Sequence, residues 1–217
     1  MRVYAINGSP RKNRNTATLL QKVLDGVKES LKDEEVETEI INLYDLKYTG
    51  CKSCFACKRI GGKSYGKCII KDDIYEVLEK ISQADGIIFV SPIYFGNLSG
   101  QLMSFLERLL FQYLVYDKNY STIAPKKMPI GFIYTMNVQE EFMESYGNLQ
   151  GFTHLESYLE RTFTKPIVMY SNNTYQFDDY SKYESSGFSE EEKRKHRETQ
   201  FPIDCQKAFE LGMNLIK

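Results

Sequence analysis

The chain has 217 residues, of which 42% are hydrophobic and 26% charged, with 28 basic against 29 acidic side chains. A chain of this length can bury a core without disulfides, so we expect one globular domain spanning residues 1–217. The net charge of -1 gives no general electrostatic reason for a nucleic-acid or membrane partner, and we expect neither.

The N-terminus does not read as a secretory signal, because no long apolar run follows the positive charge of Met1–Asn7. No window approaches the about 18 apolar residues of a transmembrane helix. We therefore expect a cytoplasmic, reducing location. Clustered cysteines in such a location more often indicate metal or redox chemistry than structural disulfides.

The first elements are a strand, a helix and a second strand. The short apolar run 3–6 predicts a strand, and apolar residues at helical spacing over 17–31 predict a helix after a polar turn. Residues 36–44 alternate apolar and charged positions, which is typical of a half-covered strand. The positions expected on its covered face are Val36, Thr38 and Ile40.

A cysteine-rich loop at residues 50–68 comes next. Asp72 and Asp73 are then expected to cap a helix. The apolar face of that helix would carry Ile74, Val77, Leu78 and Ile81. The wholly apolar run 86–90 predicts a parallel strand buried on both faces, which should stop at Ser91.

The second half of the chain continues the alternation of strands and helices. The expected elements are a helix at 99–110, a strand at 128–134, a helix at 148–163, a strand at 166–170, a polar Tyr-rich extension at 171–187 and a helix opened by Ser189. Strands that alternate with helices predict a doubly wound, five-stranded parallel sheet in a three-layer α/β/α fold.

Ligands of open α/β sheets bind beyond the carboxyl ends of the strands, which directs attention to three loops. The loop at 8–18 combines hydroxyls and a guanidinium with a helix start, whose free N–H groups suit a phosphate. The loop at 91–101 offers flat apolar surface and a flexible glycine for a planar heterocycle. The loop at 134–137 is polar. Taken singly, each loop could also be an ordinary turn.

Three stretches together resemble the NADPH-dependent FMN reductase family, over about residues 1–112. They are Gly8-Ser9-Pro10-Arg11, the spacing Cys51-x2-Cys54-x2-Cys57 leading to Cys68, and the run at 84–96 that ends in Tyr94-Phe95-Gly96. That family has a flavodoxin-like fold and includes the iron-sulfur flavoproteins.

The resemblance implies an FMN site on the first two loops. Its phosphate contacts would be Ser9, Arg11, Asn15, Thr16, Ala17 and Thr18. Its isoalloxazine contacts would be Pro92, Ile93, Tyr94, Phe95, Gly96 and Asn97, with Thr135 and Asn137 beside them. The resemblance further implies a homodimer or a dimer of dimers. No catalytic side chain is assigned, because hydride transfer to a flavin requires none from the protein.

Four of the five cysteines fall between residues 51 and 68. Four thiolates can hold a [4Fe-4S] cluster, and Cys-x2-Cys-x2-Cys is a compact chelating run. The ten residues between Cys57 and Cys68 are a longer interval than we expect for cluster binding, although their glycines could fold the loop back. We expect reduced cysteines without a metal, with the cluster and a zinc ion as alternatives.

These observations predict an oxidoreductase that takes hydride from NADH or NADPH through FMN and passes electrons to a flavin, quinone or other small acceptor. An alternative is an iron-sulfur flavoprotein that transfers electrons with a [4Fe-4S] cluster on the four clustered cysteines and a ferredoxin-like partner. A third hypothesis is an interaction module of flavodoxin fold without enzymatic activity.

Overall fold

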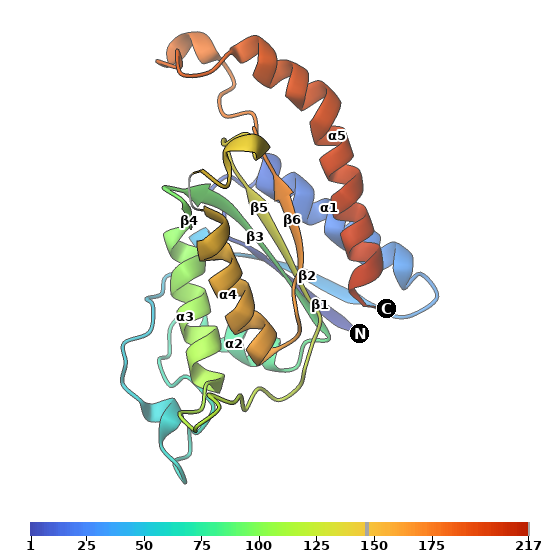
Figure 1. Ribbon diagram of the computed structural model, residues 1–217. Helices are drawn as coiled ribbons and strands as arrows, with labels where there is room; N and C mark the ends of the chain where they lie inside the picture. The colour runs from blue at the N-terminus through green and yellow to red at the C-terminus, as the bar shows by residue number, and fades with distance from the viewer. Residues whose placement is uncertain (146–147, 217) are drawn as a thin grey trace.

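Five parallel strands form the central sheet of the computed structural model, which describes residues 1–145 and 148–216, without the side chains of 148 and 149. The strands are β1 Arg2–Asn7, β2 Glu37–Asn42, β3 Gly86–Tyr94, β5 Ile130–Thr135 and β6 Ile167–Ser171. They are ordered β2-β1-β3-β5-β6 (Figure 1). This is the strand order of the flavodoxin-like fold, so the expected fold class is confirmed.

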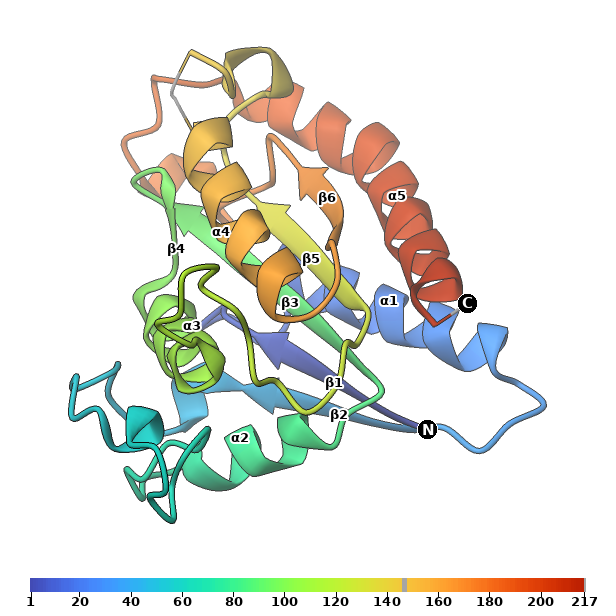
Figure 2. The same cartoon turned by 60° about the horizontal axis from the view of Figure 1, so that its bottom comes forward.

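Helices cover both faces of the sheet, which gives the expected three layers (Figures 1 and 2). The helices are α1 Asn15–Ser30, α2 Tyr75–Ser82, α3 Gly100–Tyr113, α4 Asn148–Thr162 and α5 Glu190–Leu215. Short 3-10 helices cover Leu43–Asp45, Ala56–Lys58, Glu140–Phe142 and Tyr180–Lys182. One core lies between the sheet and α2, α3 and α4, and a second lies between the sheet and α1 and α5. Within the described residues, no helix is both long and apolar enough to cross a bilayer.

Strand β3 is longer than the sequence predicts, because it continues past Ser91 to Tyr94 and turns back into β4, Asn97–Leu98. The two turn residues, Phe95 and Gly96, have φ angles of 51° and 77°. Two successive left-handed residues are typical of a tight type I′ hairpin. The hairpin adds a short antiparallel strand to the five parallel ones and projects the Phe95 ring into solvent.

The alternation in β2 is shifted by one residue from the expected phase. Ile40 is exposed, whereas Ile41 and Leu43 are buried against α2 and α3. Successive side chains of a strand point to opposite faces, so a shift of one residue exchanges the two faces completely.

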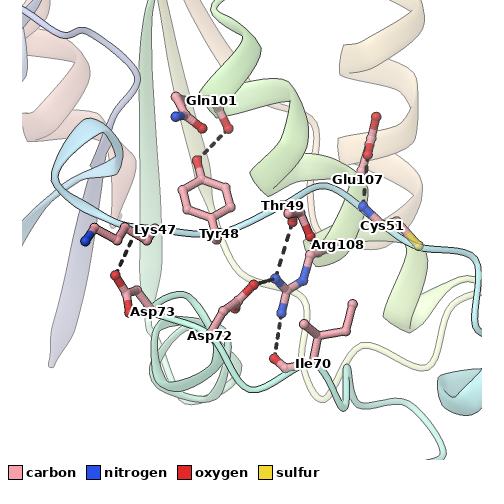
Figure 3. Close-up of polar contacts among 10 residues, drawn as sticks. All are labelled: Lys47, Tyr48, Thr49, Cys51, Ile70, Asp72, Asp73, Gln101, Glu107 and Arg108. Carbon is pink, nitrogen blue, oxygen red and sulfur yellow. Dashed lines mark hydrogen bonds and ion pairs between the residues drawn. The ribbon is translucent and has the colours of Figure 1, made fainter.

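Asp72 and Asp73 do not cap α2, contrary to expectation. Ile74 occupies the capping position, without a side-chain cap. The Asp73 carboxylate accepts a hydrogen bond from the Lys47 backbone N–H (2.7 Å), and Asp72 pairs with Arg108 of α3 (Figure 3). A buried guanidinium requires a charged partner, and this demand outweighs the modest gain from a helix cap. The expected apolar face of α2 is buried as predicted.

The last helix, α5, packs closely on α1. A Cβ atom added at Gly212 would lie 2.0 Å from the Val23 carbonyl oxygen, so glycine is required for this approach. Ser189 caps α5 as expected, accepting a hydrogen bond from the Glu192 N–H (3.3 Å).

Candidate functional site

A cavity of about 250 Å³ opens where β1, β3 and β5 end. Strand order reverses between β1 and β3, because β2 follows β1 on one side while β3, β5 and β6 extend on the other. Ligands bind at such a switch point in open α/β sheets. The lining residues are Ser9, Arg11, Arg14, Asn15, Thr16, Pro92, Ile93, Tyr94, Phe95, Thr135, Met136, Asn137, Thr174, Tyr175 and Gln176.

The β1–α1 loop forms the first wall. Buried Ser9 donates its backbone N–H to Asn7 Oδ1 (3.0 Å), and its hydroxyl oxygen accepts from the Arg11 N–H (3.1 Å). No side chain caps α1, whose first backbone bond runs from the Thr18 N–H to the Arg14 carbonyl (2.9 Å). The N–H groups of the first turn therefore have no partner within the helix, and the positive end of the helix dipole faces the loop.

A buried pair of hydroxyls joins this wall to β5. Thr16 Oγ1 and Thr135 Oγ1 share a hydrogen bond of 2.9 Å, and Thr135 Oγ1 also donates to the Ser91 carbonyl (3.4 Å). Both threonines are 4% exposed. The three loops that follow β1, β3 and β5 are thus linked at the floor of the cavity.

The β3–β4 hairpin forms the opposite wall. Tyr94 lies partly over the cavity, and burial raises the pKa of its phenol although the nearby Arg11 guanidinium opposes this. Phe95 is fully exposed. The hairpin therefore offers aromatic surface at the cavity mouth, opposite the polar first wall.

A segment distant in sequence closes the site, and we call residues 174–178 the strap. Arg11 Nη1 donates to the Gln176 carbonyl (2.8 Å), and Asn15 Nδ2 donates to the Tyr175 carbonyl (2.9 Å). The Arg14 guanidinium forms an ion pair with Asp178 and lowers the pKa of that carboxyl. The Tyr-rich extension therefore contributes to the cavity wall of its own chain.

Ten of the fourteen residues assigned from the sequence line this cavity. The other four are Ala17, Thr18, Gly96 and Asn97. Ala17 and Thr18 line a separate cavity of about 450 Å³, and the Thr18 hydroxyl donates to the Arg14 carbonyl (3.1 Å). A role for the four in cofactor binding stays a prediction.

Five lining residues were not assigned from the sequence, and they are Arg14, Met136, Thr174, Tyr175 and Gln176. Arg14 had a local signal, since it is a basic residue beside a predicted helix start. The strap residues lie in the Tyr-rich extension, whose composition does not show which of its residues reach the cavity.

The four clustered cysteines surround a second, much smaller cavity of about 20 Å³ beside α3. The loop between Cys57 and Cys68 folds back as its glycines allow. Gly61 and Gly66 have φ angles of 73° and 75°, and the Gly66 N–H donates to the Cys57 carbonyl (2.9 Å). The ten intervening residues therefore do not separate Cys68 from the other three cysteines.

Helix α3 holds the ends of this cysteine segment. The Cys51 N–H donates to Glu107 Oε2 (3.0 Å; Figure 3), and the Cys68 N–H donates to Gln112 Oε1 (3.0 Å). Gln112 lies twelve residues beyond Gly100, at which α3 starts next to the hairpin. At a rise of about 1.5 Å per residue these positions are about 18 Å apart along the helix axis. The cysteines thus lie at the far end of α3 from the first cavity (Figure 1).

Among the described residues, no three Cys, His, Asp or Glu side chains are grouped as one metal ion would require. A zinc ion needs such a tetrahedral group, whereas a four-iron cluster is larger and spreads its thiolate ligands over separate irons.

The sequence model of the NADPH-dependent FMN reductase family matches residues 1–152. An iron-sulfur flavoprotein of Methanocaldococcus jannaschii is 43% identical over 108 residues, which are 50% of this chain and 51% of that protein. An iron-sulfur flavoprotein of Archaeoglobus fulgidus is 44% identical over 108 residues, covering 50% of this chain and 48% of that protein. The chain thus spans about half the length of the curated relatives it matches.

Solved structures share the fold at low sequence identity. An NAD(P)H:quinone oxidoreductase from Methanothermobacter marburgensis superposes with a TM-score of 0.71 at 16% identity, covering 100% of this chain and 98% of that one. An FMN-dependent NADH-azoreductase from Bacillus anthracis, solved in complex with FMN, gives a TM-score of 0.69 at 12% identity and covers 100% and 99% of the two chains. At these identities the similarity establishes the fold alone.

Proposed function

The chain belongs to the NADPH-dependent FMN reductase family, and from this premise we propose that it binds FMN in the cavity at the ends of β1, β3 and β5. It would use NADH or NADPH to reduce a flavin, a quinone or another small acceptor. The observation that carries the proposal is the pairing of an anion-binding helix start with an aromatic hairpin across one cavity.

The polar wall fits the phosphate of FMN. The first-turn N–H groups of α1 and the Ser9 hydroxyl provide neutral donors, and Arg11 adds a positive charge. The Thr16 hydroxyl would become a further donor by turning from Thr135 to the phosphate. This donor set resembles neither a Walker loop nor a dinucleotide fingerprint, whose sequences are both absent. A single phosphate ester is therefore the better match than a nucleoside triphosphate.

The opposite wall fits a flat ring system. Pro92 and Ile93 line this wall, and Tyr94 and Phe95 provide aromatic surface beside them. The strap supplies the third side through Tyr175 and Gln176. When bound, FMN supplies the hydride-accepting ring and the onward transfer of electrons. The protein binds and orients the ring and excludes water from one of its faces.

Flavin uptake tests this proposal. Purified protein, or apo-protein after addition of FMN, should show flavin absorption and should bind FMN more tightly than riboflavin, which lacks the phosphate. NADH or NADPH oxidation with quinone and flavin acceptors should then require bound FMN. Failure to take up FMN would refute the proposal. The remaining hypothesis would then be an interaction module of flavodoxin fold without enzymatic activity.

The cysteine cavity favours a second candidate function. All four clustered cysteines line that cavity, and the curated relatives named above are iron-sulfur flavoproteins. We propose that Cys51, Cys54, Cys57 and Cys68 hold a [4Fe-4S] cluster, which would let the protein exchange single electrons with a ferredoxin-like partner. About four irons and four sulfides per chain in anaerobically reconstituted protein would support this candidate, and none would exclude it.

The two candidate sites lie at opposite ends of α3, which bears on assembly. Electron transfer between them would be shortest if a second subunit brought its cysteine segment to the first subunit's hairpin. We therefore propose a homodimer or a dimer of dimers. Light scattering of the loaded protein tests the assembly, and a monomer would refute it.

A further inference from the structure

Two buried N–H groups beside the cysteines lack a hydrogen-bond partner among the described residues. They are Arg108 Nε and Gln112 Nε2, and both residues line the cysteine cavity. Arg108 is 1% exposed and Gln112 is 3% exposed. A buried donor without a partner costs folding free energy, so native proteins rarely leave one unused.

The other polar atoms of both side chains are already engaged. The terminal nitrogens of Arg108 donate to the Asp72 carboxylate and to the backbone carbonyls of Thr49 (3.3 Å) and Ile70 (2.9 Å; Figure 3). Gln112 Oε1 accepts from the Cys68 N–H (3.0 Å). These contacts fix both side chains, so the two unused N–H groups have defined positions.

Both donors belong to residues that line the cysteine cavity. Arg108 and Gln112 are four residues apart on α3, which puts them on one face of the helix. Cys68 lines the same cavity, and its backbone N–H is bonded to Gln112. The polar wall of the cavity otherwise consists of cysteines and Lys52.

We propose that Arg108 Nε and Gln112 Nε2 donate hydrogen bonds to sulfur atoms of the iron-sulfur cluster and thereby raise its reduction potential. This inference rests on the second candidate function. Reduction adds negative charge to the cluster, and N–H donors directed at sulfur stabilise that charge. The two residues are then cofactor-binding residues from α3, although neither ligates iron.

Potentiometry of reconstituted protein, followed by electron paramagnetic resonance, tests the proposal. Gln112→Met keeps the length of the side chain and removes the donor. Losing one hydrogen bond to a charged group corresponds to about a tenfold change in an equilibrium constant. The ratio of reduced to oxidised cluster at a fixed potential should fall by about tenfold, which for one electron is a shift of about 59 mV to lower potential.

Two further variants separate the donor from other effects. Gln112→Glu keeps the oxygen that accepts from Cys68, loses the amide donor and should also lower the potential. Arg108→Lys keeps the charge and removes Nε, with the same expected direction. Gln101→Met is the matched control on the same helix, about 16 Å from Gln112 along its axis, and should leave the potential unchanged.

The outcomes distinguish the inference from the function on which it rests. If the wild type binds no iron, the second candidate function is wrong and the inference falls with it. If the wild type binds the cluster and both Gln112 variants keep its potential, only the inference is overturned, and the two donors serve a buried water instead. If both Gln112 variants lose iron while their circular dichroism shows that they remain folded, Gln112 serves to hold the cysteine loop in place. That result would also overturn the inference.

Discussion

Replacing Thr16 with valine removes one hydroxyl from the buried pair at the floor of the cavity proposed to bind FMN. The partner hydroxyl, on Thr135, keeps a second acceptor, the Ser91 carbonyl at 3.4 Å. The reverse variant, Thr135→Val, leaves the Thr16 hydroxyl buried without a partner among the described residues. The two substitutions delete the same 2.9 Å hydrogen bond and differ in what they leave behind.

The expected effects on stability follow from this difference. Thr16→Val should lower the free energy of unfolding of the apo-protein by about 0.5–1.5 kcal/mol, the net value of one hydrogen bond. Thr135→Val should lower it by about 1–3 kcal/mol, because it adds the desolvation penalty of an unpaired hydroxyl. Urea titration of the two apo-variants measures both numbers.

The expected effects on FMN affinity have the opposite order. Thr16 stands in the first turn of α1, where the phosphate is proposed to bind, so Thr16→Val should weaken FMN binding by about 10- to 100-fold. Thr135→Val should weaken it less. Riboflavin is the control ligand, and Thr16→Val should leave its affinity unchanged.

Flavin fluorescence quenching measures these dissociation constants. If Thr16→Val weakens the binding of FMN and of riboflavin equally, the phosphate does not bind at the first turn of α1. If Thr16→Val destabilises the apo-protein more than Thr135→Val does, the expected penalty of the unpaired Thr16 hydroxyl is wrong.

Three further predictions concern the fold around the two sites. Gly212→Ala should lower the free energy of unfolding by about 3 kcal/mol or more, because its Cβ would lie 2.0 Å from a backbone oxygen of α1. Gly151→Ala, in open space on α4, should be neutral or stabilising by up to about 1 kcal/mol. Urea titration compares the two variants. Arg108→Met should lower the free energy of unfolding by up to about 3 kcal/mol by leaving the partly buried Asp72 carboxylate unpaired, and a loss below 1 kcal/mol would contradict that ion pair. Burial lowers the pKa of Lys193 from its ordinary 10.5 to about 8, so between these values the unfolded chain holds this proton and the folded chain does not, and the contribution of Lys193 to stability should rise with pH. The difference in the free energy of unfolding between the wild type and Lys193→Met should therefore change with pH across that window, and a constant difference would contradict the assignment.

The layers of the fold and part of the lining of the proposed FMN site could be predicted from the sequence. The apolar run 86–90 requires burial on both faces, and the apolar stripe of α1 requires a sheet to pack on. Polar loops that follow parallel strands meet at one edge, so Ser9, Tyr94 and Thr135 could be assigned to one site before the structure was known.

Local pattern was insufficient where two local signals competed. Ile40 and Ile41 are adjacent, and only packing against α2 and α3 decides which of them is buried. Asp72 is a good helix cap by residue type, yet Arg108, distant in sequence, takes its carboxylate. In both cases a long-range contact outweighs a local preference worth about 1 kcal/mol.

The third wall of the proposed FMN site and the grouping of the cysteines depend on long-range contacts and loop conformation. The hydrogen bond from Arg11 to Gln176 joins residues 165 apart in sequence. Hydrophobic periodicity predicts local helices and strands, and it cannot predict a contact between residues so far apart. Counting residues between Cys57 and Cys68 argued against a shared site, whereas the left-handed turns at Gly61 and Gly66 bring the two together. Sequence spacing sets the length of a loop, but backbone conformation sets where its ends meet.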